Sequence, residues 1–146
     1  MSVIAWDGKV LAADRQSLRG DTIGSTKKIW SLKNGGAIAC AGLLPHGLAL
    51  KNWVENGMKK EEFPQVNENE KWALLVVVLP GKPVVFYENR PEPIEIFDPF
   101  VAWGVGREVA LGVMAMGGDA IRAVEIASQF VSGCGNGCDH VCVEKE

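Results

Sequence analysis

The sequence predicts an α+β protein built as a four-layer αββα sandwich, in which two stacked antiparallel sheets carry helices on their outer faces. Three observations predict this fold. Short apolar segments bounded by turn residues recur along the chain, and segments with helical spacing are grouped apart from them. The 146 residues are 47% apolar and 23% charged, which is enough for one substantial core. We therefore expect residues 1–146 to form a single domain.

The chain begins with a predicted β-hairpin. Residues 3–6 and 9–13 are short apolar strands, and Asp7-Gly8 between them is a dipeptide favoured in two-residue type I′ turns. The turn chemistry alone predicts two paired strands at the start of the chain.

Two polar residues flank this hairpin. Ser2 directly precedes its first strand, and Asp14 follows its second. Because a small residue after Met1 usually allows Met1 to be trimmed, we expect Ser2 to carry a hydroxyl and a free α-amine. An α-amine titrates at about 7.7 to 8, so this pair can serve as a nucleophile with its own base.

A polar segment and two strands are predicted next. Residues 15–26 are polar with glycines that mark turns, and we expect irregular strand pairing there. Residues 28–32 have a strand pattern, and Asn34-Gly35 is a second strong hairpin turn. Residues 37–41 are apolar on both faces, which favours a central strand.

The first predicted helix covers residues 46–55. Its apolar residues recur at helical spacing, and Asn56-Gly57 ends it. Residues 59–71 are mostly charged or polar, which indicates a surface connection.

The second half of the chain is predicted to hold strands followed by two helices and a last strand. Residues 107–116 form a helix rich in Ala, Leu and Met, and Asp119 N-caps a second helix that ends near residue 130. The predicted strands of this half are residues 72–79, 83–87, 94–97, 100–103 and 138–143.

The charge and composition of the chain exclude several classes of binding partner. A formal net charge of −3 without a basic patch argues against nucleic acid or an acidic membrane surface. No apolar run approaches the roughly 20 residues of a membrane span, and the N-terminus lacks the pattern of a secretion signal. We therefore expect a cytoplasmic protein. The chain has no GxxxxGK loop, so we expect no ATPase activity, and no cofactor is expected.

The cysteines suggest two alternative chemistries. In a cytoplasmic chain they are expected to be thiols, so a thiol-dependent role for Cys134 and Cys138 stays open. On an extended strand Cys138, His140 and Cys142 would share one face, as metal ligands do. Three ligands two residues apart on one strand make a poor tetrahedron, so we expect packing of small residues instead of a metal site.

Four motifs occur together in a suggestive order. They are Ser-Val-Ile-Ala-Trp-Asp-Gly-Lys-Val-Leu-Ala-Ala-Asp at residues 2–14, Lys28-Ile29, Ala39-Cys40-Ala41-Gly42 before a helix, and Gly104-Val105-Gly106 before another. This order resembles the proteasome β-subunit and bacterial ATP-dependent peptidase family of N-terminal nucleophile (Ntn) hydrolases, and in particular small phage and bacterial homologues.

The resemblance implies a set of catalytic residues. Ser2 matches the N-terminal nucleophile, with its α-amine as general base. Lys28 matches the lysine that lowers the pKa of that amine, and Asp14 the carboxylate that orients the lysine. Gly42 matches the residue whose backbone N–H stabilises the oxyanion. The family also implies a peptide or protein substrate, a homo-oligomer such as a ring, and a separate ATP-dependent unfoldase as partner.

The chain departs from the family pattern, and two functions stay open. Serine replaces threonine, Val105 replaces a hydroxyl residue, Ala39 replaces a glycine, and the turn at residues 134–137 lacks the usual carboxylate and serine unless Asp139 or Ser132 supplies them. The first function is hydrolysis of an amide or peptide bond by Ser2. The second is a catalytically inactive proteasome-like fold that serves as an oligomeric structural or interaction protein. A retained Met1 would abolish the first.

Overall fold

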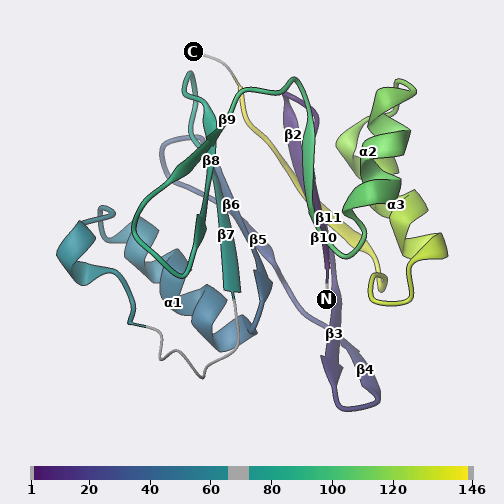
Figure 1. Ribbon diagram of the computed structural model, residues 1–146, viewed down its shortest axis with the longest axis horizontal. Helices are drawn as coiled ribbons and strands as arrows, with labels where there is room; N and C mark the ends of the chain where they lie inside the picture. The colour runs from purple at the N-terminus through teal and green to yellow at the C-terminus, as the bar shows by residue number, and fades with distance from the viewer. Residues whose placement is uncertain (1, 66–72, 145–146) are drawn as a thin grey trace.

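The computed structural model describes residues 2–65 and 73–144 (Figure 1). Within these residues it has three α-helices, and every strand pair is antiparallel, so the predicted α+β class is confirmed. The elements in chain order are β1 (Val3–Trp6), β2 (Val10–Asp14), β3 (Gln16–Arg19), β4 (Thr22–Ser25), β5 (Ile29–Ser31), β6 (Ala37–Gly42), α1 (Leu44–Glu55), the 3₁₀ turn η1 (Lys60–Glu62), β7 (Ala73–Val78), β8 (Val84–Glu88), β9 (Ile94–Ile96), β10 (Val101–Gly104), α2 (Arg107–Ala115), α3 (Ala120–Phe130) and β11 (Cys138–Cys142).

The strands form two larger sheets and one small one. The four-stranded sheet has the order β10-β1-β2-β11, and the five-stranded sheet the order β5-β6-β7-β8-β9. Strands β3 and β4, from the polar segment, pair with each other and with no other strand of the described residues. The predicted central strand is β6, which lies between β5 and β7. Its residues 37–41 are all buried, as an apolar pattern on both faces predicts.

The core has three parts because each central strand is buried on both faces. Successive side chains of a strand point to opposite faces, so β1 turns Ile4 to one cluster and Val3 to another. One cluster joins the two larger sheets and includes Ile4, Leu11, Ile29, Ala39, Val76 and Trp103.

The helices cover the other face of each sheet (Figure 1). Helices α2 and α3 pack on β1 and β2 through small residues, so their backbones approach the sheet closely. Helix α1 packs on β6 and β7, where Trp53 contacts Phe63 and Tyr87 edge to face. Each larger sheet therefore has a helical layer.

The first hairpin turn differs from its prediction. The backbone N–H of Asp7 donates to the carbonyl of Val10 at 3.3 Å, so Gly8 and Lys9 are the central residues instead of Asp7 and Gly8. Of these two only Gly8 has a positive φ, 98°, whereas a type I′ turn needs two. The Asp7 carboxylate explains the shift, because its Oδ1 accepts the backbone N–H groups of Lys9 and Val10 at 2.9 and 2.8 Å.

Other boundaries move by one or two residues. Helix α1 begins at Leu44, two residues before its predicted start, because Pro45 is favoured in the first turn of a helix. Asp119 caps α3 as predicted, since its carboxylate accepts the backbone N–H of Arg122 at 2.7 Å. Met1, Trp72 and residues 66–71 of the predicted connection lie outside the described residues. No helix in the described part of the chain is long and apolar enough to cross a membrane.

Substitution of Asp7 should destabilise the protein measurably. Besides its two turn contacts, the carboxylate accepts the N–H of Ala120 at 2.8 Å, which is one of the unpaired donors at the start of α3. Asp7→Ala removes all three bonds, so we expect the free energy of unfolding in urea to fall by about 1–3 kcal/mol. Lys9→Ala in the same turn is the control, with an expected change within about 0.5 kcal/mol. Equal stability of both variants would contradict the role of Asp7.

Candidate active site

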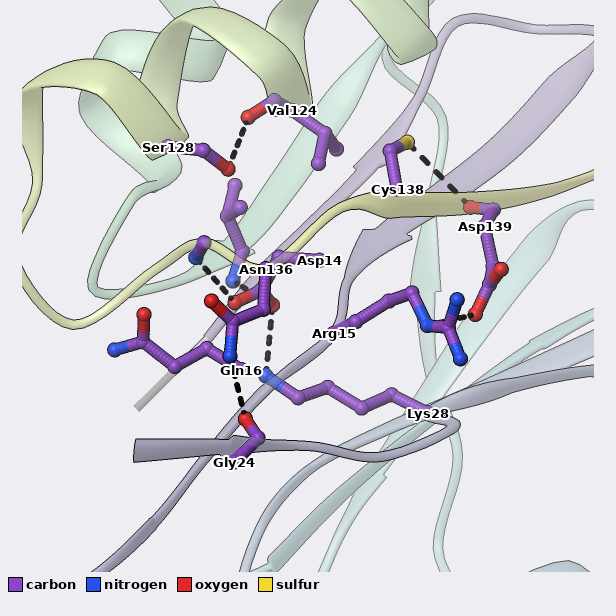
Figure 2. Close-up of polar contacts among 12 residues, drawn as sticks. Asp14, Arg15, Gln16, Gly24, Lys28, Val124, Ser128, Asn136, Cys138 and Asp139 are labelled. Carbon is purple, nitrogen blue, oxygen red and sulfur yellow. Dashed lines mark hydrogen bonds and ion pairs between the residues drawn. The ribbon is translucent and has the colours of Figure 1, made fainter. Parts of the chain in front are cut away.

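Asp14 is a carboxylate with no solvent exposure at the end of β2 (Figure 2). Its Oδ1 accepts the ammonium of Lys28 at 2.7 Å and the backbone N–H of Val3 at 3.2 Å. Its Oδ2 accepts the backbone N–H of Gly135 at 3.0 Å. A buried carboxylate is tolerated only when it is paired and hydrogen-bonded, and Asp14 meets both conditions.

Lys28 lies directly before β5 and is itself buried, with 6% of the residue exposed. Its carbonyl accepts the N–H of Cys40 at 2.9 Å, which fixes its backbone to β6. From there its side chain reaches across to Asp14, as Figure 2 shows. The structure therefore brings together two residues that sequence analysis selected 14 positions apart.

Ser2 is held by the turn of residues 104–106. The N–H of Gly106 donates to the carbonyl of Ser2 at 3.2 Å. Gly104 has a φ of 92°, and a Cβ on it would come within 2.2 Å of that same carbonyl oxygen. Position 104 therefore needs glycine, because the backbone of the turn lies directly against the carbonyl of Ser2. The sequence pattern did not predict this role of the turn.

Two cavities meet at Ser2. The larger, about 650 Å³, is lined by Ser2, Lys28 and Gly42 among others. The smaller, about 430 Å³, also reaches Ser2 and Gly42 and has Val105 in its wall. Gly42 ends β6 with a φ of 93° and faces both cavities. Three of the four residues selected from the sequence therefore line one cavity. The fourth, Asp14, is buried and accepts a hydrogen bond from the Lys28 ammonium.

The C-terminal turn at residues 134–137 contributes backbone groups to the site, whereas the family pattern described above has a carboxylate and a serine in this region. Gly135 gives its N–H to Asp14, and its carbonyl accepts the N–H of Arg15 at 3.0 Å. Ser132 contributes only its carbonyl, to Gln16 at 3.1 Å, and Asp139 pairs with Arg15 at 3.4 Å. Sequence reasoning missed Gly135, because a backbone donor has no side-chain signature.

The pKa values of the Cys40, Cys134 and Cys138 thiols are shifted in the direction opposite to the one that a thiol-dependent site requires. Burial raises the pKa of Cys134 to about 11 and that of Cys138 to about 12, so both stay protonated near neutral pH. Cys40, which lines the larger cavity, also has its pKa raised to about 11 by burial. A reactive cysteine needs the opposite shift. Among the described residues, no three His, Cys, Asp or Glu side chains gather as metal ligands would.

Removal of the Lys28 charge should cost stability. Lys28→Met leaves the Asp14 carboxylate buried with backbone donors alone, so we expect the free energy of unfolding to fall by about 3–5 kcal/mol. The double variant Asp14→Asn/Lys28→Met carries neither charge and should regain part of that loss. Urea unfolding followed by tryptophan fluorescence measures both. Lys33→Met, at an exposed lysine, is the control, and an equal effect of Lys28→Met and Lys33→Met would contradict the pairing.

By sequence alone, no protein-family model and no curated protein matches the chain. Solved structures do match it. BPH from Thiobacillus denitrificans, in complex with epoxomicin, aligns with a TM-score of 0.74 at 18% identity and covers 100% of both chains. HslV from Trypanosoma brucei aligns with a TM-score of 0.74 at 19% identity over 99% of both chains.

A third match comes from the helical assembly of the Anbu complex of Pseudomonas aeruginosa. It has a TM-score of 0.67 at 13% identity and covers 97% of this chain and 80% of that chain. The likeness to HslV and BPH spans nearly the whole chain, so the resemblance found in the sequence motifs is confirmed at the level of the fold. The chain has the fold of HslV and proteasome-like β-subunit peptidases.

Proposed function

We propose that this protein hydrolyses amide bonds, most simply peptide bonds, with Ser2 as nucleophile after removal of Met1. One observation carries the proposal: Ser2, Lys28 and Gly42 line a single cavity, and the buried Asp14 holds the lysine by its ammonium. The fold shared with HslV and with BPH, which was solved in complex with epoxomicin, also supports amide hydrolysis as the function.

Each residue has a defined task in this mechanism. The α-amine of Ser2 takes the hydroxyl proton while Oγ attacks the substrate carbonyl carbon. Lys28, a nearby cation, lowers the pKa of the amine and so keeps it unprotonated. The backbone N–H of Gly42 donates to the oxyanion that forms. Asp14 keeps the ammonium of Lys28 in place through their 2.7 Å contact.

Two further steps complete the catalytic cycle. The tetrahedral intermediate collapses to an ester on Ser2, the C–N bond breaks, and the leaving nitrogen takes the proton from the α-amine. Water next attacks the ester with the same amine as base, which releases the carboxylic acid and restores the Ser2 hydroxyl. Met1 must be absent because an acylated nitrogen cannot accept the proton.

The wider setting of this activity is also a proposal. We propose that the three core clusters belong to the four-layer αββα sandwich of Ntn hydrolases, formed by residues 1–146 as one domain. We further propose a cytoplasmic homo-oligomer such as a ring, supported by the Anbu relative, which was solved as a helical assembly. Peptides or proteins would be its substrates, delivered by a separate ATP-dependent unfoldase.

One observation favours a second candidate, an inactive fold with a structural role. Val105, which stands at a hydroxyl position of the family pattern, is 45% exposed and lines the smaller cavity beside Ser2. An apolar side chain there offers no hydrogen bond to the α-amine. Under this alternative the protein assembles but does not react at Ser2.

Mass spectrometry of the untagged protein tests the two candidates. The hydrolase proposal predicts loss of Met1 and a single epoxomicin adduct, which peptide mapping places on Ser2. Ser2→Ala should form no adduct, and Ser17→Ala, which changes another hydroxyl of the larger cavity, should react as the wild type does. Retention of Met1 together with no adduct would sink the hydrolase proposal and favour the structural role.

A further inference from the structure

The two cavities at Ser2 suggest how a substrate lies. They share Ser2, Ala41 and Gly42 and extend away from these residues along different walls. An amide has an acyl half and an amine half on either side of the carbonyl carbon that Ser2 would attack. A substrate bound across Ser2 therefore places one half in each cavity.

The charges of the two cavities differ. Among the described residues that form the wall of the larger cavity there is no carboxylate, and the charged side chains are Arg19 and Lys28. Lys28 is already paired with Asp14. Arg19, the last residue of β3, is exposed and makes no hydrogen bond or ion pair within the part of the chain that the structure describes. Its guanidinium is therefore available to a bound ligand.

The wall that carries Arg19 is anchored to the body of the protein. Strands β3 and β4 extend beyond the two larger sheets (Figure 1). The Asn136 side chain donates to the carbonyl of Gly24 in β4 at 2.8 Å, a contact drawn in Figure 2. The N–H of Thr26 donates to the carbonyl of Arg15 at 2.7 Å, which closes the base of this hairpin. Arg19 is thus presented by a hairpin tied at its base.

The smaller cavity suits the amine half. Its charged side chains are Glu88 and Arg107, and the guanidinium of Arg107 already donates to the carbonyl of Gly104 at 3.1 Å. Cleavage of a peptide bond releases an α-amine, which is mostly protonated at neutral pH because its pKa is about 7.7 to 8. Arg107 keeps its positive charge, so the charged residues of the smaller cavity balance, whereas those of the larger cavity are both cations. The released cation is therefore better accommodated beside Glu88. This assigns the amine half to the smaller cavity and the acyl half to the larger.

We propose that Arg19 selects substrates whose residue on the acyl side of the cleaved bond carries a carboxylate side chain, namely Asp or Glu. The inference rests on the proposed function for the position of the cleaved bond. A guanidinium binds a carboxylate through two parallel N–H donors, which a neutral amide of the same shape cannot match. Because Arg19 is exposed, the selectivity is modest, about fivefold for Glu over Gln.

The test uses fluorogenic peptide amides that differ only in the acyl-side residue, which is Glu, Gln or Lys. For the wild type we expect kcat/KM for Glu to exceed that for Gln about fivefold. Arg19→Gln should abolish this preference, and Arg19→Glu should favour the Lys substrate. Arg122→Gln, at an exposed arginine on α3 away from both cavities, is the matched control and should keep the wild-type order. An unchanged Glu preference in Arg19→Gln would overturn the proposal.

A binding measurement separates this inference from the proposed hydrolysis. Calorimetry on the Ser2→Ala variant compares two acetylated peptide amides that end in Glu or in Gln, with and without Arg19→Gln. Tighter binding of the Glu peptide that is lost with Arg19→Gln supports the cavity assignment even when no substrate is cleaved. Equal binding of both peptides would overturn it even when hydrolysis is observed.

Discussion

The buried ion pair of Asp14 and Lys28 is the interaction on which the site depends. A carboxylate with no exposure needs every one of its donors, and Asp14 takes them from Val3, Lys28 and Gly135. Those donors come from three separate segments, so the pair joins the first strand, the start of β5 and the C-terminal turn. Because Ser2 precedes Val3 directly, the bond from the Val3 N–H to Oδ1 of Asp14 holds the backbone next to Ser2 at the oxygen that also accepts Lys28.

Close backbone approach completes the arrangement. Gly104 and Gly106 let the turn after β10 lie against the carbonyl of Ser2, and any side chain at Gly104 would collide with it. The same residues lead into α2, which packs with α3 on the outer face of β1. Ser2 is therefore held by the glycine turn through its own carbonyl and by Asp14 through the neighbouring Val3. Such rigid support is what preorganised catalysis requires.

Much of the fold could be predicted because its signals are local. Turn dipeptides, the unbroken apolar run of β6 and the Asp119 cap each depend on residues close in sequence. A local signal still misplaced the first turn, because the Asp7 carboxylate accepts the N–H groups of Lys9 and Val10 and so shifts the turn by one residue. The motif resemblance selected Ser2, Lys28 and Gly42, which the structure brings to one cavity, whereas no sequence signal selected Gly135 or Arg19. Gly135 acts through its backbone, and Arg19 reaches the cavity only after β3 and β4 pair.

In the proposed mechanism Lys28 makes the α-amine of Ser2 a usable base, and the pH dependence of labelling at Ser2 measures this effect. The rate of epoxomicin attachment to Ser2 should rise with pH as the amine loses its proton. We expect a midpoint below the ordinary α-amine pKa of about 7.7 to 8, because the ammonium of Lys28 disfavours a second positive charge. A midpoint within or above that ordinary range would mean that Lys28 does not lower the pKa of the amine.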